Sequence, residues 1–144
     1  MPYSKILFPT DLSRLGDAAL PLATMIARDR RAELIILHVQ ELPRTYAPGE
    51  WTFFPLEPDL EAIKQMLDEV KPTDPKVPYT HRMVEGDPAT EIMCVAKDEG
   101  VEMIVMSTHG RTGLPRVLMG SVAEAVVRRA PCPVVTIKQR PEGK

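Results

Sequence analysis

STHGRTGLPRVLMGS, residues 107–121, joins a short apolar run, Val101–Met106, to a helix-like segment, Ser121–Ala130. This order predicts a strand, a flexible loop and the first turn of a helix. Glycines at positions 110, 113 and 120 allow backbone amides to turn inward where a side chain would block approach. The helix start adds unpaired N–H groups and the positive end of the helix dipole, which together hold phosphates. The stretch is therefore typical of an anion site.

A second interpretation of the same helix start needs no ligand. Ser121 and Glu124 have the spacing of a capping box, in which the serine caps the helix and the glutamate returns the hydrogen bond. Glycine-rich turns are common, so the local pattern leaves both interpretations open. They are compatible, because one hydroxyl can cap an empty helix and turn to a phosphate when one arrives.

Outward from this stretch, short apolar runs alternate with helix-like segments along the whole chain. This alternation predicts an α/β fold: a single open, doubly wound, five-stranded parallel sheet with helices on both faces and right-handed connections. The predicted strands are Lys5–Phe8, Glu33–Val39, Val77–Glu85, Val101–Met106 and Pro133–Ile137. The predicted helices are Ser13–Arg30, Leu60–Val70, Pro88–Glu99 and Ser121–Ala130.

Local signals mark the ends of several elements. Pro21 lies inside the first predicted helix and should kink it, because proline removes a backbone hydrogen bond. Asp87 is expected to cap the third helix, with Pro88 at its first position and Gly100 at its end. Val77–Glu85 alternates apolar with polar residues, which is typical of a half-exposed edge strand.

One long connection has no clean periodicity. Gln40–Glu57 contains several prolines, which predicts a long loop or lid. Its aromatic residues, Trp51, Phe53 and Phe54, could cover a pocket or pack on the domain, and packing is the commoner role.

The composition limits the class of protein. A chain of 144 residues suits one domain, 1–144, and 44% hydrophobic with 26% charged residues is ordinary for a globular protein. The net charge of -2 gives no sign of a nucleic-acid surface. We see no leader-like segment and no apolar run near the ~20 residues of a membrane span, so we expect a cytoplasmic protein.

Several chemistries lack their motifs. The chain has no Gly-x4-Gly-Lys-Ser/Thr phosphate loop, and Pro9–Ser13 stands where a dinucleotide fingerprint would follow the first strand. His38, His81 and His109 show no metal-ligand spacing, and Cys94 and Cys132 form neither a metal nor a redox pattern. His109 lies in the loop but has no activated partner in view. We therefore expect neither a metal site nor a catalytic residue.

Polar loops follow the predicted strands at the edge where a parallel sheet binds its ligand. If the fourth strand lies beside the first, Asp11 faces the glycine-containing loop across one crevice. Its carboxylate could accept hydrogen bonds there from a ribose or an amine. The alternative for Asp11 is an Asx-type turn, which the local sequence favours.

The chain resembles the universal stress protein family over nearly its whole length, from Lys5–Asp11 to Pro131–Val135. The nucleotide-binding subclass of that family has the signature Gly, two residues, Gly, nine residues, then Gly and Ser or Thr. Gly110 and Gly120–Ser121 match it, whereas Ser107 replaces the first glycine. The resemblance implies a strand order of 3-2-1-4-5, and the serine implies weakened or re-tuned phosphate binding rather than loss.

By this resemblance the ligand is ATP, with Mg²⁺ or Mn²⁺ held through its phosphates. Asp11 would contact the ribose, and the backbone of Val39 would contact the adenine. The phosphates would be bound by Ser107, Gly110, Gly120 and Ser121. The remaining pocket residues would be Pro9, Thr10, Gly86, Met106, His109, Arg111 and Val122.

Two functions remain from different classes. The first is an ATP-binding stress-response or signalling module that acts by nucleotide occupancy, with at most very slow hydrolysis. The second is an interaction protein of the same fold that binds no nucleotide and works through its dimer surface. In both, the short apolar strand Val134–Ile137 would be a sheet edge, so we expect a homodimer that pairs two copies of it about a two-fold axis.

Overall fold

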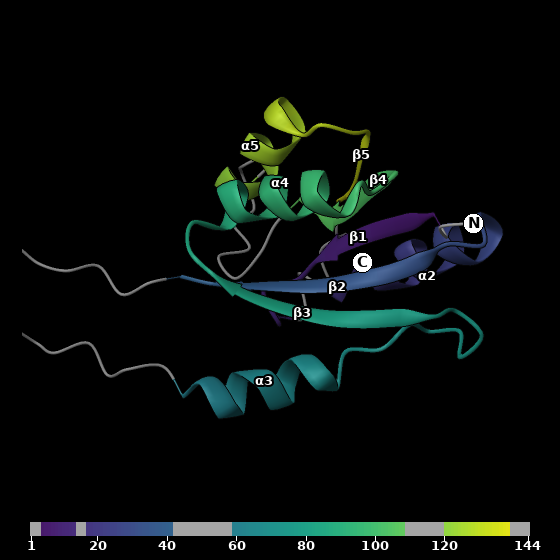
Figure 1. Cartoon of the computed structure of the whole chain (residues 1–144), viewed down its shortest axis with the longest axis horizontal. Coiled ribbons are helices and arrows are strands. Elements are labelled where there is room, and N and C mark those ends of the chain that lie inside the picture. The colour runs from purple at the N-terminus through teal and green to yellow at the C-terminus, as the bar shows by residue number, and fades with distance from the viewer. Residues whose placement is uncertain (1–3, 14–16, 42–58, 109–119, 139–144) are drawn as a thin grey trace, which may run out of the picture.

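The computed structural model describes residues 4–13, 17–41, 59–108 and 120–138, and in these ranges strands alternate with helices (Figure 1). The strands are β1 (Lys5–Pro9), β2 (Glu33–Gln40), β3 (Tyr79–Glu85), β4 (Met103–Ser107) and β5 (Val134–Ile137). The helices are α2 (Leu20–Asp29), α3 (Leu60–Asp68), α4 (Pro88–Glu99) and α5 (Ser121–Arg129). The predicted loop or lid lies outside the described residues from position 42 to its end.

The strands form one five-stranded parallel sheet in the order β3-β2-β1-β4-β5. β1 pairs with β2 on one side and with β4 on the other, so the direction in which strands are added reverses at β1. β2 and β3 pair from Leu34↔Tyr79 to Gln40↔Glu85, which leaves β3 at one edge of the sheet and β5 at the other. The predicted fold class, the strand order and the edge position of β3 are confirmed.

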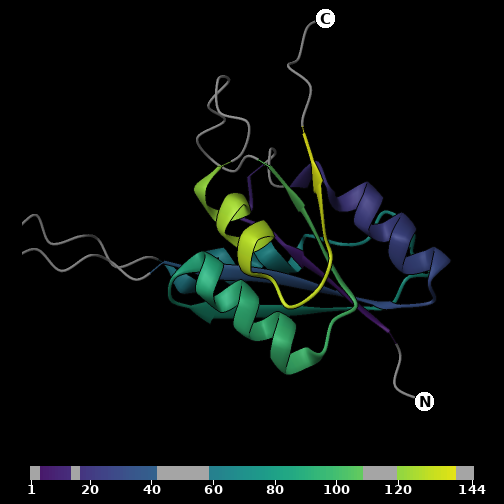
Figure 2. The same ribbon diagram turned by 90° about the horizontal axis from the view of Figure 1, so that it is seen from above.

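Helices cover both faces of the sheet (Figure 2). One core contains Ile6 and Phe8 of β1 with the alanines of α2, and the other contains Leu7 of β1 with residues of α4 and α5. Successive side chains of a strand point to opposite faces, so a strand covered on both sides must be apolar throughout. Full burial of each such side chain contributes roughly 1.5–3 kcal/mol. Ala23 and Ala27 of α2 and the N-cap residue Ala19 are small enough to bring that helix close to the sheet.

The first predicted helix is interrupted ahead of Pro21. The N–H of Asp17 donates to the carbonyl of Ser13 at 3.0 Å, which is a helical hydrogen bond, but α2 begins only at Leu20. Pro21 therefore lies in the first turn of α2, where its missing N–H would be unpaired in any helix. The predicted kink within one continuous helix is wrong. In such a helix the ring of Pro21 would clash with the carbonyl of Asp17, four residues earlier, and here a new helix begins instead.

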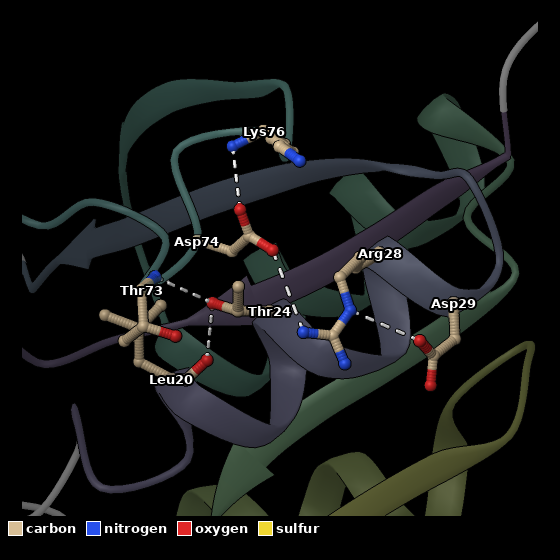
Figure 3. A network of polar contacts seen from close by, with 7 residues as sticks. All are labelled: Leu20, Thr24, Arg28, Asp29, Thr73, Asp74 and Lys76. Carbon is tan, nitrogen blue, oxygen red and sulfur yellow. Dashed lines mark hydrogen bonds and ion pairs between the residues drawn. The ribbon is translucent and has the colours of Figure 1, made fainter.

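Polar contacts fasten α2 to the segment between α3 and β3 (Figure 3). The buried Thr24 hydroxyl donates to a carbonyl one turn earlier at 2.8 Å and accepts the Thr73 N–H at 3.2 Å. Arg28 and Asp74 lie 3.7 Å apart as an ion pair, and Asp74 also accepts the Lys76 N–H at 2.9 Å. Since exposed ion pairs contribute little, the buried Thr24 contacts provide most of this attachment.

Both ends of α4 are as predicted. The Asp87 carboxylate accepts the N–H of Thr90 at 3.1 Å and its hydroxyl at 2.8 Å, and Pro88 opens the helix. These hydrogen bonds, the backbone one first, hold the pKa of Asp87 below its ordinary value. Gly100 ends α4 in the left-handed conformation, with φ of 60°.

Among the helices of the described residues, α3 is the least buried. Leu67 is its buried member, whereas Leu60 is 40% and Met66 is 49% exposed, so the predicted apolar stripe is covered only in part. None of the helices in the described ranges has the length and apolar character needed to cross a membrane. A cytoplasmic location stays a prediction.

Candidate functional site

A cavity of about 420 Å³ opens at the carboxyl ends of β1, β2 and β4. The starts of α4 and α5 close its far side. It lies where strand order reverses, which is where open α/β sheets bind their ligands. Its described lining residues are Pro9, Thr10, Asp11, Leu37, His38, Val39, Gln40, Glu41, Pro88, Ile92, Met106, Ser107, Thr108, Gly120, Ser121, Val122 and Ala123.

The turn after β1 presents Asp11 to the cavity. Asp11 Oδ1 accepts the N–H of Ser13 at 2.9 Å and also the Ser13 hydroxyl, which forms the Asx turn that local sequence favoured. Leu12, between them, has φ of 67°, a left-handed conformation that is costly for a residue with a side chain. The two interpretations of Asp11 are thus compatible, because the turn uses one carboxylate oxygen while the residue lines the cavity.

Thr10 holds this turn from beneath. Its N–H donates to the Leu37 carbonyl at 2.8 Å, and its hydroxyl donates to Asp17 Oδ1 at 2.6 Å while accepting the Leu12 N–H at 2.9 Å. Burial raises the pKa of Asp17, the Thr10 hydrogen bond opposes the rise, and the Asp11 charge adds to it. Thr10 is 5% exposed, so these contacts are shielded from water.

The start of α5 differs from the predicted capping box. Gly120 is the N-cap, and Ser121 is the first helical residue, with an exposed side chain. The Glu124 carboxylate accepts from Arg128 instead of returning to the helix start. The capping-box interpretation is therefore wrong, because a glycine N-cap has no side chain to bond the first N–H groups. These groups lie at residues that line the cavity.

The space around Gly120 leaves little room for a side chain. Its N–H donates to the Thr108 carbonyl at 2.7 Å, and a Cβ built on Gly120 would lie 3.2 Å from that oxygen. Thr108 is in turn bonded through its N–H to the Ile137 carbonyl at 2.9 Å. A side chain at position 120 would thus press on the backbone at the end of β4, with or without a ligand.

The predicted site residues fall into three groups. Gly86 is not among the described lining residues; its φ of 146° and its N–H bond to the Gln40 carbonyl at 3.0 Å give it a role in the turn after β3. His109, Gly110 and Arg111 lie outside the described residues. The structure brings the others together around the cavity: Pro9, Thr10, Asp11, Val39, Met106, Ser107, Gly120, Ser121 and Val122.

Sequence reasoning missed other lining residues. His38 and Gln40 lie two apart at the end of β2, a spacing that places their side chains on one face of a strand. That alternation could have singled them out beside Val39. Pro88 and Ile92 contribute from the first turns of α4, and only the packing of α4 on the sheet brings them here.

The described residues offer no metal centre. Among them, no group of three or more His, Cys, Asp or Glu side chains is placed to hold an ion. Cys94 and Cys132 are free, and burial raises the pKa of the Cys132 thiol.

An open parallel sheet with a cavity at its reversal point defines a doubly wound α/β protein, a class in which ligands bind beyond the strand ends. The model of the universal stress protein family matches residues 2–138, and the chain belongs to this family. It is 36% identical over 143 residues to universal stress protein MJ0531 of Methanocaldococcus jannaschii. The matched region covers 95% of this chain and 83% of that protein.

Solved structures share the fold. Universal stress protein UspA from Lactobacillus plantarum matches with a TM-score of 0.73 and 27% identity, over 95% of this chain and 99% of that one. The universal stress protein from Archaeoglobus fulgidus in complex with dAMP matches with a TM-score of 0.65 and 22% identity, over 96% and 100% of the two chains. The second likeness concerns the fold alone.

Proposed function

We propose that this protein binds an adenine nucleotide, ATP, in the cavity and acts as a stress-response or signalling module through nucleotide occupancy. One observation carries the proposal: the uncapped start of α5 and the Asp11 turn line the same cavity at the point of strand reversal. A helix start attracts phosphates, and a carboxylate accepts ribose hydroxyls. Together they suit a ligand that carries both groups.

Each part of the nucleotide has a counterpart in this arrangement. The first turn of α5, from Gly120 to Val122, would receive the phosphates through its N–H groups. Asp11 would accept from the ribose with the carboxylate oxygen that the Asx turn leaves over. The backbone of Val39 would meet the adenine, between the apolar side chains of Leu37 and Met106.

The size and chemistry of the cavity suit this ligand. About 420 Å³ falls within the ~300–1,000 Å³ of small-molecule sites. Mg²⁺ or Mn²⁺ would be held through the phosphates, because no acidic cluster of the described residues provides a protein cage. The dAMP complex of the Archaeoglobus fulgidus protein supports an adenine nucleotide as a ligand class that this fold accepts.

Thermal unfolding with adenosine, AMP and ATP tests the proposal. The stabilisation should rise in that order, because each added phosphate engages more of the helix start. ATP at 100 times its dissociation constant should add about 2.7 kcal/mol, or roughly 8 °C for a chain of this length. No shift, or equal shifts with adenosine and ATP, would contradict the phosphate site and favour a nucleotide-free interaction protein.

Assembly as a homodimer belongs to the same proposal. Among the strands of the described ranges β5 pairs only with β4, and its residues are half-buried, so its other edge leaves backbone groups available for pairing. A second copy joined across Val134–Ile137 about a two-fold axis would satisfy both edges. Light scattering should give a dimer mass at micromolar concentration, and a monomer throughout that range would refute it.

A further inference from the structure

His38 lies beneath the turn that presents Asp11. The side chain is on β2, and the residue is 3% exposed. Its Nδ1 lies 3.0 Å from the Thr10 carbonyl oxygen, and its Nε2 lies 3.2 Å from the amide oxygen Oε1 of Gln40. Both ring nitrogens of a buried imidazole are therefore in hydrogen-bonding contact.

The two partners restrict where the ring proton can be. A backbone carbonyl only accepts, so Nδ1 must carry the proton to bond Thr10. In a neutral ring Nε2 is then an acceptor, which needs a donor from Gln40. A half turn of the Gln40 amide brings its NH2 group to Nε2 and supplies that donor. The doubly protonated ring would bury a positive charge between two neutral partners, which is unfavourable.

We propose that His38 is a positioning residue for the nucleotide site, held as the neutral Nδ1–H tautomer by Thr10 and Gln40. The ring connects β2 to the turn after β1 and fixes the carbonyl that immediately precedes Asp11. This inference rests on the proposed function for its effect on nucleotide binding, but not for the state of the ring.

The turn after β1 is strained and needs contacts that hold it in place. Leu12 has φ of 67°, a conformation that persists only where neighbouring contacts hold it. Thr10 is bonded at its N–H, its carbonyl and its hydroxyl, by Leu37, His38 and Asp17 respectively. His38 is the contact on the carbonyl, and without it the peptide that joins Thr10 to Asp11 is freer to rotate.

The first test is spectroscopic and uses no nucleotide. Long-range 1H–15N spectra of the full chain labelled with 15N-histidine should show one ring with a protonated Nδ1 and an unprotonated Nε2, and this signal should be missing in His38→Asn. Gln40→Glu should yield a doubly protonated ring, because a carboxylate at Nε2 requires a donor. A protonated Nε2 on the ring whose signal is lost in His38→Asn, or no change of that ring in Gln40→Glu, would overturn the proposal.

The second test compares two substitutions of similar size. His38→Asn keeps an amide N–H near the place of Nδ1, whereas His38→Leu keeps only apolar bulk. Loss of one buried hydrogen bond should weaken ATP binding about tenfold in His38→Leu, and the asparagine should restore most of it. The backbone amide shifts of Leu12 and Ser13 should move in the leucine variant and return in the asparagine variant.

The outcomes separate the two proposals. Equal ATP affinity of both variants, or amide shifts that stay in place, would overturn the positioning role. Failure of the unmutated protein to bind ATP would contradict the proposed function, while the ring spectrum and the amide shifts would still decide the state of His38 and its hold on the turn. If His38→Leu fails to fold, the ring spectra of the unmutated protein and of Gln40→Glu still test the state of the ring. ATP affinity and the Leu12 and Ser13 amide shifts of His38→Asn, compared with the unmutated protein, still test the hold on the turn.

Discussion

Ser121→Asp tests the proposed phosphate site at the start of α5, because it should raise the stability of the free protein and weaken nucleotide binding. Ser121 is the first helical residue, its side chain is exposed, and the N-cap position is held by Gly120. A carboxylate in the first turn of a helix stabilises it through the dipole. The same carboxylate would face the incoming phosphates. The free protein should therefore become more stable while nucleotide binding is lost.

The gain in stability of the free protein and the loss of nucleotide binding differ in size. The dipole interaction contributes about 0.3–1 kcal/mol, which raises the melting temperature by about 1 to 4 °C for a chain of this length. A carboxylate about 4 Å from one phosphate charge costs about 4 kcal/mol near a protein surface. That penalty weakens binding by several hundredfold, since about 1.4 kcal/mol corresponds to a factor of ten. At an ATP concentration that saturates the unmutated protein, the shift should fall close to zero.

The assay is thermal unfolding with and without ATP, on Ser121→Asp and two controls. Ser121→Ala should leave the free protein nearly unchanged and keep about half of the ATP shift, since one hydrogen bond is worth about a factor of ten. Val127→Asp lies on the exposed face near the end of α5, so it should destabilise the free protein and keep the ATP shift. An undiminished ATP shift in Ser121→Asp would refute the phosphate site at this helix. Substitution of Gly120 would not decide it, because a side chain there presses on the Thr108 carbonyl.

Three further predictions concern stability. Asp87→Ala removes the N-cap of α4 and should cost about 1 kcal/mol, or roughly 3 to 4 °C in melting temperature, while Asp87→Asn should recover most of it. The hydrogen bond from Lys5, at 2.7 Å, lowers the pKa of Glu99 below the ordinary 4.5, so its stabilisation is present above that pH and is lost as the pH falls through the lowered pKa. Lys5→Met should therefore give a shallower fall of melting temperature on acidification, and a curve parallel to that of the unmutated protein would contradict this. Burial raises the pKa of Asp17 above 3.8, so the protein loses stability as the pH rises from 3.8 through the raised pKa. Asp17→Asn should raise the melting temperature at neutral pH by about 1 °C and should show no gain below 3.8.

The candidate site was predictable from the sequence where one local pattern decides one position. Asp11 and Gly120–Ser121 follow or precede recognisable elements, and the structure places them around one cavity. The roles of the helix-start residues were less predictable. Ser121 looked like an N-cap, but the N–H of Gly120 is bonded to Thr108, a contact between elements that fixes the glycine as the cap. The capping-box pattern spans only Ser121 to Glu124, so it gives no information about a hydrogen bond to Thr108.

Pro21 shows the same limit for the fold. The apolar spacing on either side of it predicted one helix, and the spacing is correct for the part that begins at Leu20. Whether proline bends a helix or starts a new one depends on what the preceding turn bonds to. Here Thr10 holds Asp17 at the end of the preceding turn, and that contact crosses from the β1 loop.

The sequence by itself determined the alternation of strands and helices, the caps of α4 and the half-exposed edge strand β3, because hydrophobic period and capping chemistry act within a few residues. The resemblance to the family added the strand order, because hydrophobic periodicity locates the strands but does not show which of them are neighbours in the sheet. Only the tertiary structure decided that His38 bonds Thr10, that the N–H of Gly120 bonds Thr108, and that Pro88 and Ile92 complete the cavity wall. The physical reason is that each of these contacts joins groups from different parts of the chain. The pairing of β1 with β2 brings His38 to Thr10, and the packing of α4 and α5 on the sheet brings the other groups together.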